Sequence, residues 1–245
     1  MLDEKFWDKY MKIYDLVRIL IPYQELLDEL AAELNVQEGE KILDAGCGTG
    51  NLIERIKKFG VLIYGIDNAN EVLKICKARN PEAEIVFADL NKPLLFPDGF
   101  FDKIVSNNTL YALPIEKQQL ALNEFSRILR PNGKVVISNP REKSKTLKIF
   151  TSHLKKSFSQ KGILATITEL LKVNLFSLFR LGCYNQKIER EGHFFNEIEW
   201  RNMFDRAKFT EIAIRPAYVG QAILVTAKKP PEPVQGTVQS SPVPK

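Results

Sequence analysis

Three glycines at alternate positions, Gly46, Gly48 and Gly50, follow a short apolar stretch that includes Ile42 and Leu43. Glycines in such a turn let the backbone approach a ligand closely, and the third lets the next helix pack against the strand. The GxGxG spacing differs from the GxGxxG fingerprint of dinucleotide-binding turns, whose N–H groups face a pyrophosphate. The turn therefore predicts a ligand site, and its spacing disfavours a dinucleotide.

Three carboxylates follow three successive apolar runs. Asp44 lies two residues before the first glycine, where its negative charge would repel a phosphate and attract a cationic amino group. Asp67 ends the run 62–66, a position from which carboxylates in doubly wound folds accept hydrogen bonds from both ribose hydroxyls. Asp89 follows the run 85–87 and can accept from an exocyclic amine. Adenosine with a cationic amino-acid tail satisfies all three carboxylates.

These side chains can meet only if the strands before them share one edge of a sheet. Short runs rich in β-branched residues alternate with amphipathic stretches or loops, which indicates repeated βα units. The carboxyl ends of parallel strands form the ligand site of an open α/β sheet. A lone glycine turn or terminal Asp often has only a structural role, but three such features in order favour a site. The runs lie at 42–43, 62–66, 85–87, 104–105 and 135–137.

Further strands at 210–215 and 222–227 bring the expected sheet to seven strands. We predict an α/β, doubly wound, Rossmann-like sheet that is mostly parallel, has helices on both faces and is closed at one edge by an antiparallel pair. Helical periodicity before the core breaks near Pro22. The expected organisation is an N-terminal helical segment at 1–40, a core at 41–140 and 196–228, a helical insertion at 141–195 after the fifth strand, and a disordered, proline-rich tail at 229–245.

Composition favours a globular, cytoplasmic protein. The chain has 245 residues and is 44% hydrophobic, which is enough for a substantial core. The N-terminus is acidic, no apolar signal segment follows, and charged residues interrupt the long apolar stretches. Neither a secretion signal nor a membrane-spanning helix is therefore expected. Cys47, Cys76 and Cys183 are not spaced as metal ligands, so we expect free thiols in a reducing compartment and no metal site.

Positive charge is concentrated in one segment. Residues 141–191 contain 11 Lys and Arg against 4 Glu and no Asp, although the net charge of the whole chain is only +5. A nucleic-acid-binding protein usually spreads its basic residues over a binding surface, so this confined excess indicates a local interaction face. A solvated helix face is the alternative. No nucleic-acid partner is expected.

The segment Asp44-Ala45-Gly46-Cys47-Gly48-Thr49-Gly50, followed by Asp67 and Asp89, resembles the class I S-adenosylmethionine-dependent methyltransferases. The likeness is to the small-molecule branch that includes the ubiquinone and menaquinone biosynthesis enzymes, and it covers residues 5–140 and 193–228. It implies S-adenosylmethionine as cofactor and does not indicate the substrate. Strand four ends in Asn107-Asn108-Thr109. Enzymes that methylate nucleic-acid bases or protein glutamine carry [DN]-P-P-[YF] there, so those acceptors are disfavoured.

The resemblance assigns roles to individual residues. In that family the DxGxGxG turn wraps the methionine part of the cofactor, the residue matching Asp67 holds the ribose, and the one matching Asp89 reads the adenine amine. Residues 7–15 are similar to the family's W-D-x-x-A-x-x-Y-D segment, with Met11 in place of Ala; its Tyr, here Tyr14, closes over the cofactor's carboxylate as part of a helical lid. The expected cofactor-binding residues are Tyr14, Asp44, Ala45, Gly46, Cys47, Gly48, Asp67, Asn68, Asp89, Leu90 and Asn107, the last through its backbone.

The expected function is methyl transfer from S-adenosylmethionine to a small, hydrophobic acceptor by O- or C-methylation. Such a displacement relies mainly on positioning and exclusion of water, and a general base is needed only when the acceptor must lose a proton. His193 is the candidate base, with a loop or helix-capping role as the alternative, and His153 is expected to be solvated. A catalytically silent cofactor-binding adaptor and a nicotinamide-dependent oxidoreductase are the rival functions.

The basic insertion combines its charge with Phe150, Phe158, Phe176 and Phe179. A helical cover with an aromatic underside suits a hydrophobic acceptor, because pockets for small ligands are mostly apolar. The same lysine-rich amphipathic pattern would also allow weak peripheral contact with an anionic membrane. Packing on the core alone is the third alternative.

Overall fold

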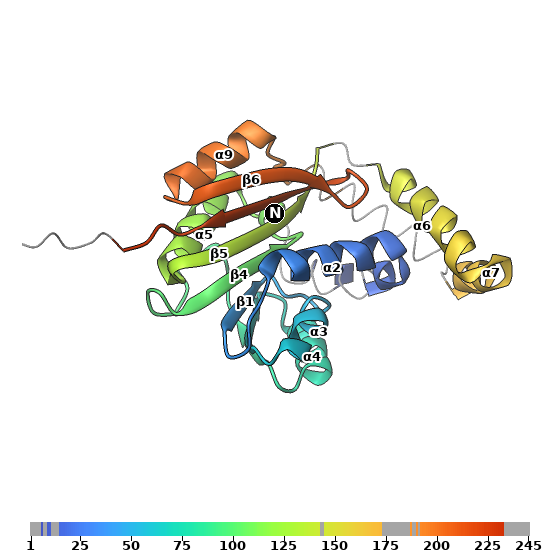
Figure 1. Cartoon of the computed structure of the whole chain (residues 1–245), viewed down its shortest axis with the longest axis horizontal. Coiled ribbons are helices and arrows are strands. Elements are labelled where there is room, and N and C mark those ends of the chain that lie inside the picture. The colour runs from blue at the N-terminus through green and yellow to red at the C-terminus, as the bar shows by residue number, and fades with distance from the viewer. Residues whose placement is uncertain are drawn as a thin grey trace, which may run out of the picture.

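The computed structural model describes residues 6, 9–10, 15–142, 145–172, 187, 190 and 192–232. Its strands are β1 (Lys41–Ala45), β2 (Leu62–Asp67), β3 (Glu84–Phe87), β4 (Phe101–Asn107), β5 (Leu129–Pro140), β6 (Thr210–Ala217) and β7 (Ala222–Lys228). They form one seven-stranded sheet in the order β3-β2-β1-β4-β5-β7-β6 (Figure 1). The first five strands run parallel, and β7 lies antiparallel between β5 and β6. The predicted doubly wound sheet is confirmed.

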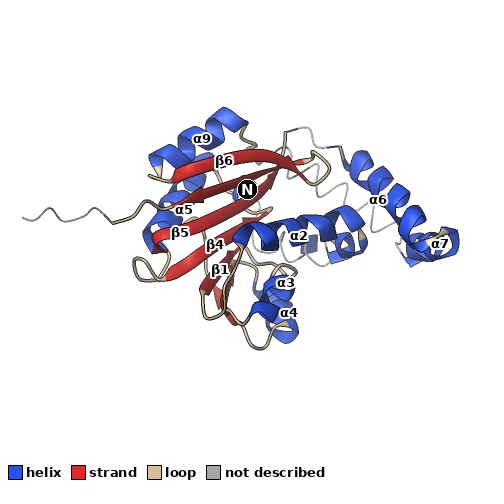
Figure 2. Cartoon of the chain, viewed as in Figure 1, coloured by secondary structure: helices blue, strands red, loops and turns tan. Residues whose placement is uncertain are grey.

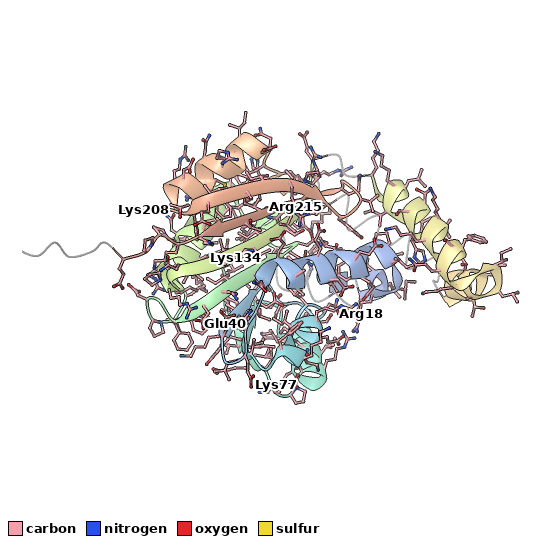
Figure 3. The ribbon with its side chains drawn as sticks, in the orientation of Figure 1. Arg18, Glu40, Lys77, Lys134, Lys208 and Arg215 are labelled. Atoms are coloured by element: carbon pink, nitrogen blue, oxygen red, sulfur yellow. The ribbon has the colours of Figure 1, made fainter. Side chains whose placement is uncertain are left out.

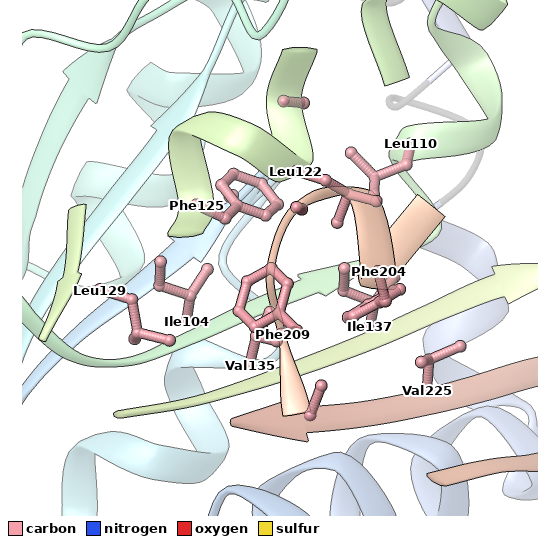
Figure 4. Close-up of a cluster of buried hydrophobic side chains, with 14 of the residues drawn as sticks. Ile104, Leu110, Leu122, Phe125, Leu129, Val135, Ile137, Phe204, Phe209 and Val225 are labelled. Atoms are coloured by element: carbon pink, nitrogen blue, oxygen red, sulfur yellow. The ribbon is translucent and has the colours of Figure 1, made fainter. Parts of the chain in front are cut away.

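Helices cover both faces of the sheet (Figure 2). Neighbouring side chains of a strand point to opposite faces, so alternate residues of the central strands serve two separate cores. The helices of the described residues are η1 (Asp15–Ile19), α2 (Ile21–Leu34), α3 (Ile53–Ile56), η2 (Lys57–Phe59), α4 (Asn70–Arg79), η3 (Leu110–Ala112), α5 (Ile115–Ile128), α6 (Thr146–Lys161), α7 (Ile163–Lys172) and α9 (Glu197–Arg206). Val105 and Val136 pack under α2, α3 and α4. Ile104 and Ile137 pack under α5 and α9 (Figure 4).

The parallel sheet has its switch point between β1 and β4. From β1 the chain proceeds outward to β2 and β3, and from β4 it proceeds in the opposite direction to β5. Where the strand order reverses in this way, a crevice opens beyond the carboxyl ends of the strands, because the flanking connections leave on opposite faces. The glycine turn follows β1 and residues 108–114 follow β4, so both flank this crevice.

The helix α2 is held on the sheet by ion pairs with Lys134 and Arg215, two of the residues labelled in Figure 3. Arg215 of β6 donates to Glu33 at 2.9 Å and also pairs with Glu29, and Lys134 of β5 contacts Glu33 at 3.2 Å. The hydrogen bond from Arg215 is the main cause of the lowered pKa of the Glu33 carboxyl. Because these groups are partly exposed, the pairs fix the position of α2 more than they stabilise the fold.

Two helix starts have local causes. The N-terminal helical segment breaks between Ile19 and Ile21, as predicted near Pro22, which occupies the first turn of α2, where its missing N–H leaves no helical bond unmade. The helix α9 begins directly after its N-cap. Its capping residue Asn196 accepts from the N–H of Glu199 at 3.0 Å, and the Glu199 carboxylate accepts from the N–H of Asn196 at 2.8 Å.

Residues 145–172 of the expected insertion form α6 and α7, and residues 173–186 lie outside the described residues. The predicted exposure of His153 is wrong, because its side chain is only 1% exposed. Helical spacing places it on the buried face of α6 with Ile149 and Ser157, while the neighbouring Lys155 lies on the exposed face. The Nδ1 atom of His153 accepts a hydrogen bond at 3.3 Å from the N–H of Ile21, one of the N–H groups that the first turn of α2 cannot satisfy itself.

The first residue of the predicted tail, Lys229, is bound to the sheet. The backbone N–H of Lys229 donates to the carbonyl of Gly133 at 2.9 Å, and its ammonium donates to the carbonyl of Leu129 at 2.7 Å. Burial lowers the pKa of this Lys229 ammonium. Residues 233–245 of the predicted tail lie outside the described residues. None of the described helices has the length and apolar character needed to cross a bilayer.

Candidate functional site

A cavity of about 370 Å³ lies at the carboxyl ends of β1, β2, β3 and β4. The sequence predictions converge on it, although they come from four separate strand ends. The predicted residues that line the cavity are Asp44, Gly46, Cys47, Gly48, Asp67, Asn68, Asp89, Leu90 and Asn107.

The glycine turn is held against the end of β2. The backbone N–H groups of Gly46 and Cys47 both donate to the carbonyl of Ile66, at 2.8 and 2.9 Å. Gly46 has a φ of +78°, and a Cβ atom there would lie 2.2 Å from the Thr109 hydroxyl oxygen. The close approach of the chain after β4 therefore requires glycine at position 46, in addition to the left-handed backbone.

The Asp67 carboxylate joins two parts of the site. Its Oδ2 atom accepts from the N–H of Gly48 at 3.0 Å, and its Oδ1 atom accepts from the N–H of Ala69 at 3.0 Å. Each carboxylate oxygen has more than one lone pair, so these bonds leave capacity for ligand hydroxyls. Asp67 thus both orders the glycine turn and faces the cavity.

Asp44 is a buried carboxyl that faces the cavity without a cation. Its side chain is 2% exposed, and among the described residues it has no hydrogen-bond or ion-pair partner. Burial, with a smaller contribution from the Asp67 charge, raises the pKa of Asp44 to about 7. A buried carboxylate is stabilised only when it is paired. A ligand with a positive group near Asp44 would supply that missing partner.

The third carboxylate, Asp89, differs from Asp44 in that it has hydrogen-bond partners. The Oδ1 atom of Asp89 accepts from the backbone N–H and the side-chain amide of Asn91, at 3.0 and 2.8 Å, which fixes the loop after β3. The side-chain oxygen of Asn107, which also lines the cavity, is buried and has no hydrogen-bond partner among the described residues. The backbone carbonyl of Asn107 accepts from the Thr109 hydroxyl at 3.1 Å. A buried, unpaired acceptor in a cavity wall favours a ligand or water that donates to it.

A polar network connects the N-terminal segment to the glycine turn. Arg79 of α4 pairs with Asp15 of η1 at 2.5 Å, and the Thr49 hydroxyl donates to Asp15 at 2.8 Å. Asn51 donates to the Tyr23 hydroxyl at 3.3 Å, and both residues line the cavity. Burial raises the pKa of the Asp15 carboxyl, but the hydrogen bonds from Arg79 and Thr49 outweigh it and the pKa is lowered. The segment before α2 is therefore fixed at the rim of the cavity.

The two described cysteines lie beside this site as free thiols. The Sγ atoms of Cys47 and Cys76 are 4.0 Å apart, and both side chains are buried. The hydrogen bond to Cys76, together with burial, raises the pKa of the Cys47 thiol well above its usual value. Cys183 lies outside the described residues.

Comparison with known proteins identifies the core. Residues 43–137 match the family model for a methyltransferase domain. A solved S-adenosylmethionine-dependent methyltransferase from Aquifex aeolicus has the same fold, with a TM-score of 0.59 over 90% of this chain and 98% of that chain at 17% identity. Residues 43–137 of this chain therefore form a methyltransferase domain.

Two relatives are similar to this chain over part of their length. An uncharacterized methyltransferase from Oceanobacillus iheyensis is 30% identical over 125 residues, which make up 51% of this chain and 58% of that protein. A demethylmenaquinone methyltransferase from a Geobacillus strain is 29% identical over 143 residues, which make up 53% of this chain and 59% of that protein. The chain thus spans less than two thirds of the length of these curated relatives.

Tyr14 of the predicted site lies outside the described residues. Two further predicted site residues, Ala45 and His193, do not line the cavity. Ala45 is fully buried, and its carbonyl accepts from the Ser106 hydroxyl at 2.8 Å beneath the cavity. His193 lines a second cavity and not the first, with its ring 4.6 Å from that of Phe195. Its backbone N–H donates at 3.1 Å to the carbonyl of Tyr111, which does line the first cavity.

Sequence reasoning missed part of the methyltransferase cavity. Tyr10 and Tyr23 come from the N-terminal segment, and Tyr111, Leu113 and Lys117 come from the stretch after β4. The rule that sites form at the carboxyl ends of parallel strands indicates the region after β4. Nothing in the local sequence singles out Tyr23, because helical periodicity shows only that α2 packs on the sheet.

Proposed function

We propose that this methyltransferase binds S-adenosylmethionine in the cavity and transfers its methyl group to a small, hydrophobic acceptor. The observation that carries the proposal is the convergence of Asp44, Asp67 and Asp89 on one cavity around a glycine turn. A nucleotide phosphate would be repelled by three carboxylates. S-adenosylmethionine carries no phosphate and has a cationic ammonium and a cationic sulfonium.

The residues present fit this cofactor. Asp44, whose buried carboxyl has no cationic partner among the described residues, would face the positive methionine part, and the glycine turn would let the backbone approach it. Asp67 would accept from the ribose hydroxyls and Asp89 from the adenine amine. Leu90 and Asn68 would contact the adenine, and the unpaired Asn107 oxygen would accept a donor.

When bound, S-adenosylmethionine supplies an electrophilic methyl group on a positively charged sulfur. The work of the protein is to hold the acceptor in line with that group and to exclude water. Tyr10, Tyr23 and Tyr111 line the cavity with aromatic surface, and the Tyr111 ring stacks on Phe194 at 5.4 Å. Such a wall supports a hydrophobic acceptor, methylated at oxygen or carbon.

The N-terminal segment is proposed to close the cavity as a lid. Support comes from the contacts of Asp15 with Arg79 and Thr49, which fix the chain directly after Tyr14 at the glycine turn. If the acceptor must lose a proton, His193 is the proposed general base. That role needs the acceptor to reach from the first cavity past Tyr111 toward the second.

The deciding experiment is an acceptor screen with the purified chain and S-adenosylmethionine, with release of S-adenosylhomocysteine as the readout. Quinol precursors, polyketides, sterols and lipids are the first acceptors to include. Product release with any acceptor supports the enzyme. Tight cofactor binding with no release over the whole screen and over cell-extract fractions would instead support the silent adaptor, and reduction of a substrate with a nicotinamide cofactor would support the oxidoreductase.

A further inference from the structure

The helices α6 and α7 carry apolar side chains that the protein does not bury. Phe158 in the last turn of α6 and Ile163, Leu164 and Ile167 in α7 are between 45% and 82% exposed. We call these four residues the α6–α7 tip. Large side chains are exposed at this level in scattered positions on most proteins, but here four lie within ten residues of sequence.

The surroundings of the tip are basic. Residues 145–168 contain five lysines and no Asp or Glu. Lys156 pairs with Glu25 of α2 at 2.6 Å, whereas Lys148 and Lys155 lie on the exposed face of α6. The exposed face also carries Leu147. Exposed apolar side chains with lysines beside them supply the two attractions that bind a protein to an anionic bilayer, burial of apolar surface and charge.

The tip is fixed relative to the body and projects from it. In Figure 1, α6 and α7 extend away from the sheet beyond the end of α2. The buried hydroxyls of Ser157 and Thr166 are 2.9 Å apart and join α6 to α7. His153 accepts from the N–H of Ile21 and thereby joins α6 to the first turn of α2. The apolar residues are therefore presented on a projection that its own inner contacts hold in place.

We propose that the α6–α7 tip docks on an anionic membrane surface. A projecting set of apolar side chains fits a fluid bilayer, which closes around it, better than a rigid protein groove, which would have to match its shape. The excess of lysine supplies the complementary charge for acidic headgroups. The tip follows β5, whose carboxyl end lies at the same edge of the sheet as the cavity, so docking would bring that edge toward the membrane.

The test is co-sedimentation of the full chain, without cofactor, with phosphatidylcholine vesicles that contain or lack phosphatidylserine. The chain should bind the anionic vesicles at low salt and release at high salt. The double substitution Ile163→Ser with Leu164→Ser should weaken vesicle binding by about tenfold or more, because both native side chains insert into the bilayer. Lys148→Gln with Lys155→Gln should weaken binding to the anionic vesicles alone.

The matched control is Leu95→Ser with Ile198→Ser, which removes two exposed apolar side chains far from the tip and should leave binding unchanged. Thermal unfolding and light scattering of each variant report on folding and on mass. No binding to anionic vesicles at low salt, or equal binding by a folded tip variant, overturns the proposal. A fall in mass of the tip variant would show that a second copy covers the tip, which also overturns it. Because no cofactor is present, these results are independent of methyl transfer.

Discussion

The carboxylate of Asp67 accepts a hydrogen bond from the backbone N–H of Gly48 at 3.0 Å, although Asp67 ends β2 and Gly48 follows β1. One side chain thus orders the glycine turn and offers acceptors to the cavity. The bond explains how a single carboxylate can have a larger effect on ligand binding than its direct contacts alone.

Asp67→Ala should weaken S-adenosylmethionine binding, because it removes a charged acceptor for the ribose hydroxyls and releases Gly48. The loss of such a hydrogen bond is worth about 1.5–3 kcal/mol, which corresponds to a roughly tenfold or larger fall in affinity by calorimetry. Asp205→Ala, at an exposed position on α9, is the control and should bind normally. Unchanged affinity in a folded Asp67→Ala protein would remove Asp67 from the site.

Asp44→Asn should make the cofactor-free protein more stable at high pH. The pKa of Asp44 is raised from 3.8 to about 7, so between these values the folded protein holds a proton that the unfolded chain releases. The free energy of unfolding therefore falls as pH rises from about 4 to about 7. The fall is roughly 1.4 kcal/mol for each pH unit in this range. In urea unfolding, the variant should have a higher free energy of unfolding than the native chain at pH 8 and the same free energy of unfolding at pH 4. An equal change at both pH values would contradict the raised pKa.

Gly46→Ala should destabilise the protein more than Gly39→Ala. Both glycines have almost the same backbone, with φ of +78° and +79°, but a Cβ at position 46 meets Thr109 whereas a Cβ at position 39 meets nothing within 4 Å. The left-handed backbone costs both variants about 1–2 kcal/mol, and overpacking adds roughly 1–3 kcal/mol to Gly46→Ala alone. Denaturant titration of the two variants measures the difference in their free energies of unfolding. Equal losses of stability would show that the Thr109 side chain moves away from the added Cβ atom at little cost.

Arg79→Gln and Asp15→Asn should each lower cofactor affinity, and the double variant should lose little more than either single one. The reason is that both act through one ion pair, which fixes the segment before α2 against the glycine turn. The side chains are 30% and 22% exposed, so global stability should change by less than about 1 kcal/mol. A calorimetric double-mutant cycle measures the coupling. Fully additive losses would mean that the pair does not position the segment.

The sheet and the carboxylates of the site could be predicted because their signals are local. A β-branched run followed by a glycine turn or an Asp reports a strand end directly, and parallel strands bring such ends to one edge. The capping box of Asn196 and Glu199 at the start of α9 is a local feature of the same kind.

The rest depends on contacts between distant segments. The burial of His153 follows from how α6 meets α2, which no lysine-rich local pattern reveals. Tyr23 reaches the cavity only because α2 crosses the sheet, tied there by Arg215 and Lys134. The placement of His193 in a second cavity depends on the path of the chain after α5 and before α9, which motif spacing does not encode.

Calorimetric titration of the full chain with S-adenosylmethionine and, separately, with NAD, at pH 6 and pH 8, tests which cofactor the cavity binds. We expect one molecule of S-adenosylmethionine to bind per chain and NAD to give no saturable signal. Affinity for S-adenosylmethionine should rise from pH 6 to pH 8, because Asp44 must be ionised to face a cation and its pKa is about 7. In Asp44→Asn that rise should disappear. Saturable NAD binding, or a folded chain that binds no S-adenosylmethionine at either pH, would contradict the account.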